Sequence, residues 1–196
     1  MSQGKQAKVL SDRQVGLVLR SLETTRYPER DRVLFLLSVK AGLRAKEIAR
    51  LTWRMVTEAQ GQVGDTLALE DHASKGRSGR PIPLHRELRT ALQALHTQRG
   101  KLTYADWPVI YSERGRGMSA NSVAHWFGRL YRGLGFSGCS SHSGRRTFIT
   151  KAARKIVEAG GSLRDVQQLA GHTSLHTTQR YVEGDSEAKR RVIELI

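Results

Sequence analysis

The segment from residue 141 to residue 181 contains side chains that could act together on a phosphate group. They are two imidazoles, one guanidinium and one phenol, from His142, Arg145, His172 and Tyr181. On a helix, His142 and Arg145 lie three residues apart and therefore share a face. A guanidinium can bind phosphate oxygens bidentately, and a tyrosine oxygen can act as a nucleophile. The segment thus predicts a site for a phosphate and a nucleophile.

The elements expected in this segment would hold these groups in place. A helix that follows His142 is predicted by apolar residues at helical spacing, namely Phe148, Ile149, Ala152, Ala153 and Ile156. The free N–H groups at its start also favour an anion. Residues 160–161 are both glycine and end this helix. Ser162 with Asp165 then forms a capping box, which opens a short helix through Leu169.

A further candidate for phosphate binding is Arg44, in a turn between two predicted helices. Gly42 is expected to end the first helix as a left-handed cap, and the second begins near Ala45. The turn would fix the backbone and point the guanidinium fork outward, which suits bidentate phosphate recognition. A solvated surface arginine is the plain alternative. Glu47, one turn on, is interpreted as a residue that holds an arginine or caps the helix.

The rest of the chain predicts mainly helices around one hairpin. Ser11 with Gln14 forms a capping box. Residues 31–41 are apolar nearly all round, as in a helix buried in a core, and residues 85–98 and 119–134 are amphipathic. Between residues 63 and 84 the apolar period changes to two, which predicts a β-hairpin. We therefore expect a mainly α domain with a small antiparallel β-sheet (α+β).

The hairpin tip, residues 74–80, reads SKGRSGR and is basic and turn-rich. One interpretation is a mobile basic loop that touches phosphates. The other is a loop in which Lys75 takes part in catalysis.

Together, these motifs resemble the tyrosine recombinases, the phage-integrase family. The order His-x-x-Arg, Leu-x-Gly-His and then Tyr nine residues on is similar to their C-terminal signature. AGLRAKEIARLTW around Arg44 resembles their first box, and the hairpin resembles the one that carries their catalytic lysine. The similarity spans roughly residues 10–181. In length the chain resembles the small invertases of fimbrial phase switching, although it could also be a piece of a longer protein.

The resemblance implies six catalytic residues: Arg44, Lys75, His142, Arg145, His172 and Tyr181. Tyr181 would attack the scissile phosphorus and form a 3′-phosphotyrosine, releasing a 5′-hydroxyl. Arg44 and Arg145, helped by His172, would bind the developing charge, and Lys75 would protonate the leaving oxygen. No cofactor, metal or ATP is expected.

The resemblance also implies supporting residues and partners. His142 would accept or donate a hydrogen bond near the tyrosine, and Glu47 would support the site. Four further basic residues are candidate DNA contacts: Arg77, Arg80, Arg146 and Lys151. The expected partners are double-stranded DNA, other copies of the chain in a tetramer on DNA, and accessory DNA-bending proteins.

Composition agrees with a nucleic-acid partner. Across 196 residues, 33 Lys and Arg against 18 Asp and Glu leave a net charge of +15, which suits a polyanion, with an anionic membrane surface second. The sequence shows no apolar run of membrane-spanning length and no secretory leader, so we expect a cytoplasmic protein, bacterial or phage-encoded. Its one cysteine, Cys139, excludes an internal disulfide.

The expected organisation has three parts. Residues 1–9 form a flexible basic segment, residues 10–181 a catalytic domain, and residues 182–196 a C-terminal tail. The tail ends in apolar residues, which we expect to dock on a neighbouring protomer rather than on their own domain. The expected function is site-specific DNA recombination. The alternatives are a type IB topoisomerase and a catalytically silent DNA-binding regulator.

Overall fold

The computed structural model describes residues 7–74, 78–100, 103–181 and 193–194. Within these ranges helices dominate, and the two strands form one antiparallel sheet, which confirms the predicted fold class. The helices are α1 (Asp12–Leu22), α2 (Pro28–Val39), α3 (Ala45–Ala49), the 3-10 helix η1 (Trp53–Met55), α4 (Arg86–Arg99), α5 (Ala120–Gly133), α6 (Ser143–Lys155), α7 (Leu163–Ala170) and α8 (Leu175–Gln179). The strands are β1 (Thr66–Leu69) and β2 (Arg80–Pro83).

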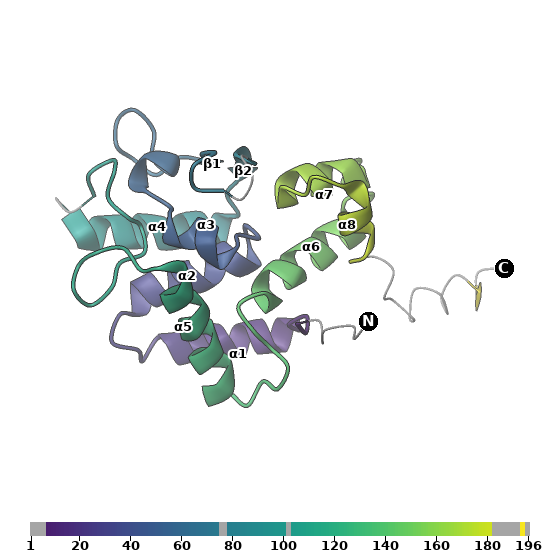
Figure 1. Cartoon of the computed structure of the whole chain (residues 1–196), viewed down its shortest axis with the longest axis horizontal. Helices are drawn as coiled ribbons and strands as arrows, with labels where there is room; N and C mark the ends of the chain where they lie inside the picture. Colours follow the sequence, from purple (N-terminus) through teal and green to yellow (C-terminus); the bar gives the residue numbers. More distant parts are fainter. Residues whose placement is uncertain (1–6, 75–77, 101–102, 182–192, 195–196) are drawn as a thin grey trace.

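Helix α2 lies at the centre of the larger core. It contacts α4, α6, α1 and α3 (Figure 1), and its side chains from Val33 to Val39 are all buried. The apolar character expected of this helix is therefore confirmed. It begins at Pro28 rather than at Asp31, because a proline suits the first position of a helix. The capping box of Ser11 and Gln14 is present at the start of α1.

The predicted hairpin is the pair β1 and β2. Its register pairs Leu67 with Ile82, and both of these side chains are buried in the larger core. The hairpin tip includes residues 75–77, so the predictions for Lys75 and Arg77 fall on residues outside the described ranges. The strand β2 contacts α7, and this contact joins the hairpin to the C-terminal helices.

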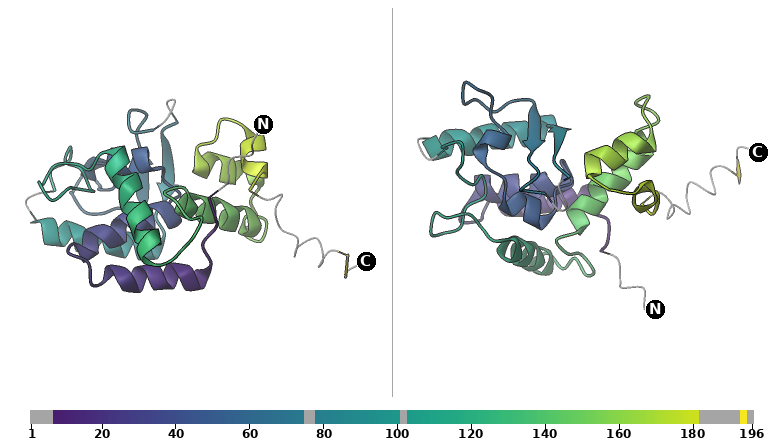
Figure 2. Two further views of the ribbon diagram at one scale, coloured as in Figure 1. Left: turned by 60° about the horizontal axis from the view of Figure 1, so that its bottom comes forward. Right: turned by 45° about the horizontal axis from the view of Figure 1, so that its top comes forward.

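Helices α6, α7 and α8 form a second unit with a small core of its own. They stand to one side of α1–α5 in all views (Figures 1 and 2). Ile149, Val166 and Ala170 are buried there, and the predicted apolar stripe of α6 packs around them. The capping box of Ser162 and Asp165 is also present. The short helix α8 was not expected from the sequence.

The two ends of the chain are described only in part. At the start, the backbone N–H of Lys8 donates to Gly138 O at 3.1 Å, and that of Leu10 donates to Thr147 Oγ1 at 2.8 Å. The predicted tail, residues 182–196, lies outside the described ranges except for Ile193 and Glu194. Among the helices that are described, none is long and apolar enough to cross a membrane.

Helix α6 approaches α2 closely at Gly144. A Cβ at this position would lie 2.9 Å from Ser38 Cβ and 3.0 Å from Val39 Cγ1, and it would clash with Ser38 Oγ. We expect Gly144→Ala to lower the free energy of unfolding by about 1–3 kcal/mol, because a tight core does not accept an added methyl group.

The control is Gly128→Ala in α5, where nothing lies within 4 Å of the added atom. That change should stabilise the protein by about 0.5–1 kcal/mol, since alanine is the better helix former. Urea unfolding measures both variants. Equal or higher stability of Gly144→Ala would contradict the close approach of the two helices.

Candidate active site

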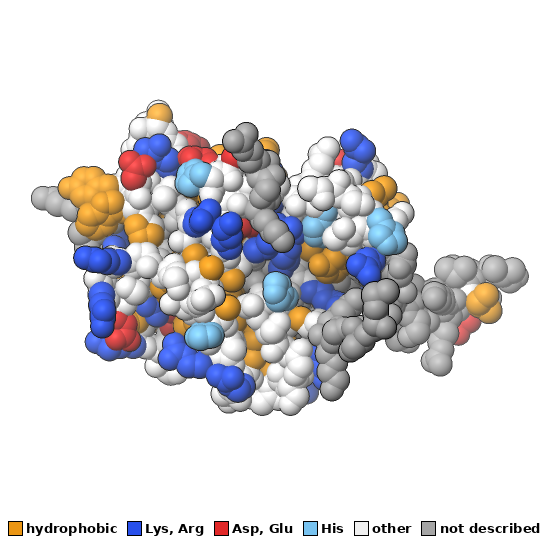
Figure 3. Space-filling model, viewed as in Figure 1, with side chains coloured by type: hydrophobic (Ala, Val, Ile, Leu, Met, Phe, Trp, Pro, Cys, Tyr) orange, Lys and Arg blue, Asp and Glu red, His pale blue; other side chains and the backbone are white. Residues whose placement is uncertain are grey.

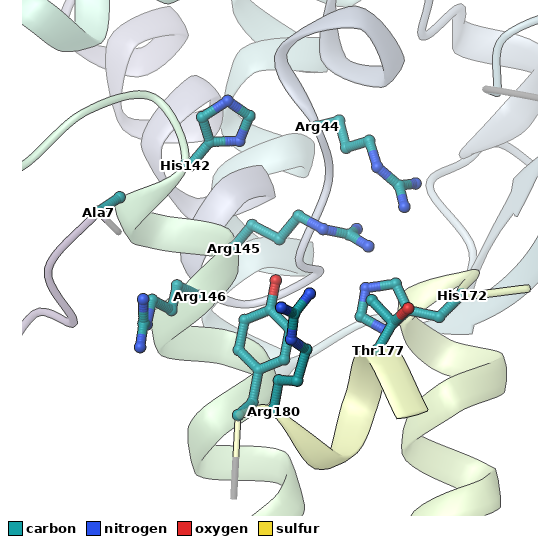
Figure 4. Close-up of a pocket in the computed structure, with 9 residues that line it drawn as sticks. Ala7, Arg44, His142, Arg145, Arg146, His172, Thr177 and Arg180 are labelled. Carbon is teal, nitrogen blue, oxygen red and sulfur yellow. The ribbon is translucent and has the colours of Figure 1, made fainter. Parts of the chain in front are cut away.

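The structure brings most of the predicted catalytic residues to one cavity of about 360 Å³. Arg44, His142, Arg145, His172 and Tyr181 all line it, and Figure 4 shows labelled side chains from both units converging there. The cavity lies between Arg44 at the start of α3 and residues of α6–α8. On the face shown in Figure 3, Lys and Arg side chains gather between α3 and α6. The other lining residues are Ala7, Arg146, Thr177 and Arg180.

Arg44 is held at the N-terminus of α3 by Glu47. The carboxylate of Glu47 accepts hydrogen bonds from Arg44 N at 2.8 Å and from Arg44 Nη1 at 2.7 Å. Arg44 Nη2 reaches Gly171 O at 3.4 Å. Gly42, with φ +66°, makes the turn that starts this arrangement. The Arg44 side chain stays 25% exposed, so its fork remains accessible from the cavity.

Arg145 is buried and joins the two units. It lies in the first turn of α6, where Nη1 donates to Gly42 O and Nη2 donates to Ala170 O, both at 2.6 Å. Burial, with the charge of Arg44 nearby, lowers the pKa of Arg145 to about 10. The guanidinium therefore still carries its charge at neutral pH. Its two short bonds fix the direction in which that charge faces the cavity.

Glu47 is the shared counter-ion of three arginines. Its Oε1 lies 2.7 Å from Arg44 Nη1 and 3.4 Å from Arg80 Nη1, and its Oε2 lies 4.0 Å from Arg145 Nη1. Burial alone would raise the pKa of Glu47, but the charge of Arg80, the hydrogen bond from Arg44 N and the other two guanidinium groups outweigh it and hold the pKa below its usual value. Three positive groups around one carboxylate leave two positive charges in surplus, which suits a phosphate.

His172 follows the left-handed cap of α7 and lies against Tyr181. The cap residue Gly171 has φ +59°, and His172 Nδ1 is 3.0 Å from Thr178 Oγ1. The rings of His172 and Tyr181 are stacked with centroids 5.7 Å apart. Burial first, and then the charges of Arg145, Arg44 and Arg80, lower the pKa of His172 to about 4. The imidazole is thus neutral at pH 7 and can donate one hydrogen bond to an oxyanion.

We expect the His172 ring to titrate near pH 4 rather than near the usual 6.5. Between these two values the unfolded chain binds more protons than the folded one. The contribution of His172 to the free energy of unfolding is therefore fully present above about pH 6.5 and is lost as the pH falls toward 4. NMR titration of the ring protons, assigned with His172→Gln, measures the midpoint. A midpoint at or above 6.5 would show that the ring is not held in its neutral form.

Tyr181 lies just after α8, at the edge of the cavity. The Arg146 guanidinium carbon is 5.9 Å from the centre of its ring, and Tyr181 is within electrostatic reach of Arg145. His142 is the exposed N-cap of α6, and its backbone N–H donates to Ser140 Oγ at 3.3 Å. Both side chains therefore border the space in which a phosphate would meet the arginines.

The structure places the candidate DNA contacts in different surroundings. Arg146 lines the cavity, whereas Lys151 pairs with Asp12 of α1. Arg80 was a candidate DNA contact at the turn-rich tip of the hairpin, but its residue is only 8% exposed and its side chain contacts Glu47. The burial of Arg80 could have been predicted from the alternation of residues in β2, because Arg80 and the buried Ile82 lie on one face of the strand.

Thr178 also belongs to the site and was missed. It is fully buried beneath His172, and nothing in the sequence distinguishes it from the neighbouring Thr177, which is exposed. Within the described ranges, no group of three or more His, Cys, Asp or Glu side chains is placed to hold a metal ion.

Known proteins resemble this chain over most of its length. The sequence profile of the phage integrase family matches residues 8–188. Tyrosine recombinase XerC of Pelobacter propionicus is 31% identical over 171 residues, which cover 87% of this chain and 53% of the relative. The protein of the same name from Serratia marcescens is 32% identical over 158 residues, covering 80% of this chain and 48% of the relative. The chain thus spans about half the length of these curated relatives.

Solved structures share the fold. The crystal structure of XerA recombinase superimposes with a TM-score of 0.73 at 21% identity, covering 95% of this chain and 64% of that one. The post-cleavage complex of XerH site-specific recombinase bound to a palindromic difH substrate gives a TM-score of 0.74 at 20% identity, covering 98% of this chain and 53% of the other.

Proposed function

This chain belongs to the phage integrase family, and on that premise we propose that it cleaves and rejoins double-stranded DNA at specific sites through a 3′-phosphotyrosine intermediate. The observation that carries the proposal is the cavity that Tyr181 and His172 line together with Arg44 and Arg145. The cavity combines a candidate nucleophile with candidate donors for a phosphate. Along the chain these residues follow the order of the family signature.

In the proposed reaction, the Tyr181 oxygen bonds to the scissile phosphorus as the bond to the 5′-oxygen breaks. The tyrosine proton passes to an acceptor, for which His142 in the same cavity is our candidate, and a proton goes to the leaving oxygen, for which Lys75 is our candidate donor. Free tyrosine ionises near pH 10, so the attack needs a proton acceptor or a positive field.

Contacts in the structure support the donors that we assign to the transition state. Arg145 is fixed by its bonds to two carbonyl groups, and Arg44 by Glu47. His172 is neutral and adds a third donor. Preorganised donors of this kind stabilise the developing charge by about 3 kcal/mol each in a site that excludes water.

The proposed partners follow from charge and from the relatives. A net charge of +15 favours a polyanion, and the Tn1549 transposon integrase, a structural relative, was solved in complex with a circular intermediate DNA. We infer that this chain binds duplex DNA in the cytoplasm and assembles on it as a tetramer, with DNA-bending proteins as further partners. The tail, residues 182–196, is the segment that we expect to reach a neighbouring protomer.

A library of nicked duplexes with randomised cores tests the cleavage proposal without knowledge of the target. A nick beside the scissile phosphate lets a short fragment diffuse away, so the covalent protein–DNA adduct accumulates. We expect a denaturant-resistant adduct that protease removes, and sequencing of the captured DNA should reveal a preferred core. The adduct should form in the presence of EDTA and without ATP.

Two other outcomes would support the alternatives. DNA binding without any adduct would indicate a silent regulator. Relaxation of a supercoiled plasmid that lacks the captured core would indicate a topoisomerase.

A further inference from the structure

Arg80 connects the hairpin to the turn that carries His172. Its Nε donates to Leu169 O at 2.8 Å, and its Nη1 donates to Ser78 O at 3.1 Å. The same Nη1 lies 3.4 Å from Glu47 Oε1. One guanidinium thus contacts the hairpin, the helix α3 that carries Glu47, and the end of α7.

The turn at Gly171 packs closely against the Arg80 side chain. A Cβ at Gly171 would lie 2.6 Å from Arg80 Nη1 and 2.8 Å from its Cζ. Gly171 also has φ +59°, a conformation that strains other residues. It directly precedes His172 and offers its carbonyl to Arg44 Nη2 at 3.4 Å. A shift of the turn would therefore move His172, a proposed donor, and also the Gly171 carbonyl that contacts Arg44, the other proposed donor.

Arg80 is not built to contact DNA. Its side chain is 7% exposed, and its Nη2 is buried without a hydrogen-bond partner among the described residues. A buried guanidinium pays a large desolvation cost, and an apolar side chain of similar volume would fill the space with less penalty. An apolar residue, however, could neither pair with Glu47 nor donate a hydrogen bond to the Leu169 carbonyl.

We propose that Arg80 is a positioning residue, which holds the turn 169–172 against the hairpin and so sets the places of His172 and Arg44 for cleavage. The proposal rests on the proposed function. Lysine cannot replace this residue, because one ammonium group cannot reach three separate acceptors in the geometry of the guanidinium fork. The hairpin that Arg80 anchors also carries Lys75, five residues earlier in the chain.

The first test separates DNA binding from cleavage in Arg80→Met and Arg80→Lys. The matched control is Arg54→Met, which removes the charge of a surface arginine paired with Asp106. Both Arg80 variants should bind the captured core with the affinity and salt dependence of the control. At saturating DNA, adduct formation should fall about 100-fold, in line with the loss of a preorganised donor.

Two results would overturn the proposal. One is adduct formation by both variants at the rate of the control. The other is weaker binding, with the slope of log affinity against log salt reduced by about 0.9 and a normal rate at saturation, because this pattern marks a phosphate contact.

A second test uses stability and does not depend on activity. Gly171→Ala is introduced into the wild-type protein and into Arg80→Ala, and the melting temperatures of the four proteins are compared. The loss caused by Gly171→Ala should be smaller in Arg80→Ala, where the clash is gone and only the backbone strain remains.

Equal losses in the two backgrounds would show that Arg80 does not hold the turn, and the proposal would fail. If the wild-type protein forms no adduct, the proposed function fails, while this cycle still decides the role of Arg80.

Discussion

Tyr181→Phe should form no covalent adduct with DNA, while it folds and binds DNA as the wild type does. The change removes one oxygen atom and keeps the ring, which stacks on His172 at 5.7 Å and lies beneath Arg146. Without that oxygen no bond to phosphorus can form. The adduct is measured with the captured core on a nicked duplex, and binding is measured by titration of the intact duplex.

The matched control is Tyr104→Phe, which removes the same atom from an exposed residue outside the cavity. This variant should form the adduct at the wild-type rate. An adduct in Tyr181→Phe would mean that another residue is the nucleophile, and the proposed mechanism would be wrong at its central step.

Arg145→Lys should reduce the rate of cleavage by about 10²–10³-fold, the usual effect of losing one preorganised donor. Arg145 spans two carbonyl oxygens with its two terminal nitrogens, at Gly42 and Ala170, and a single ammonium group cannot do so. The variant should also be less stable, because the bond to Gly42 O joins α6 to the turn before α3 and the bond to Ala170 O joins α6 to α7. Single-turnover cleavage and thermal unfolding measure the two effects.

Arg44→Lys should reduce the cleavage rate as strongly as Arg145→Lys, because a single ammonium group cannot bind a phosphate bidentately. It should lower the free energy of unfolding much less, because Arg44 is partly exposed. The control is Arg50→Lys at the other end of α3, where the arginine donates to His72 O in an exposed place. A cleavage rate in Arg44→Lys equal to that of the control would show that bidentate binding at this position is not needed.

The sequence predicted those parts of the fold that depend on short-range signals. Two capping boxes, the hairpin and the left-handed conformation of Gly42 were all expected and are present. The expectation that Gly42 caps the helix was wrong, because α2 ends at Val39 and its C-cap is Lys40 in the right-handed conformation. In each case the residues that determine the structure are close together in the chain. The core of α2 was also expected, because its apolar residues leave no polar face.

What the sequence did not reveal depends on packing between distant segments. Arg80 looked like a loop residue until β2 placed it against Glu47, 33 residues earlier. Nothing local shows that Glu47 serves three arginines, or that Thr178 lies beneath His172. The family resemblance supplied the catalytic residues, but the residues that hold them in place became visible only in the structure.

The surplus charge around Glu47 also affects how this protein would respond to selection. Three guanidinium groups around one carboxylate repel each other, and under the proposed function this repulsion is relieved only when a phosphate binds, so the free protein would be less stable than it could be. Arg44 contributes to this repulsion and is only loosely enclosed. A screen for heat resistance alone would therefore favour neutral residues at position 44 and would discard activity, a trade-off between stability and function.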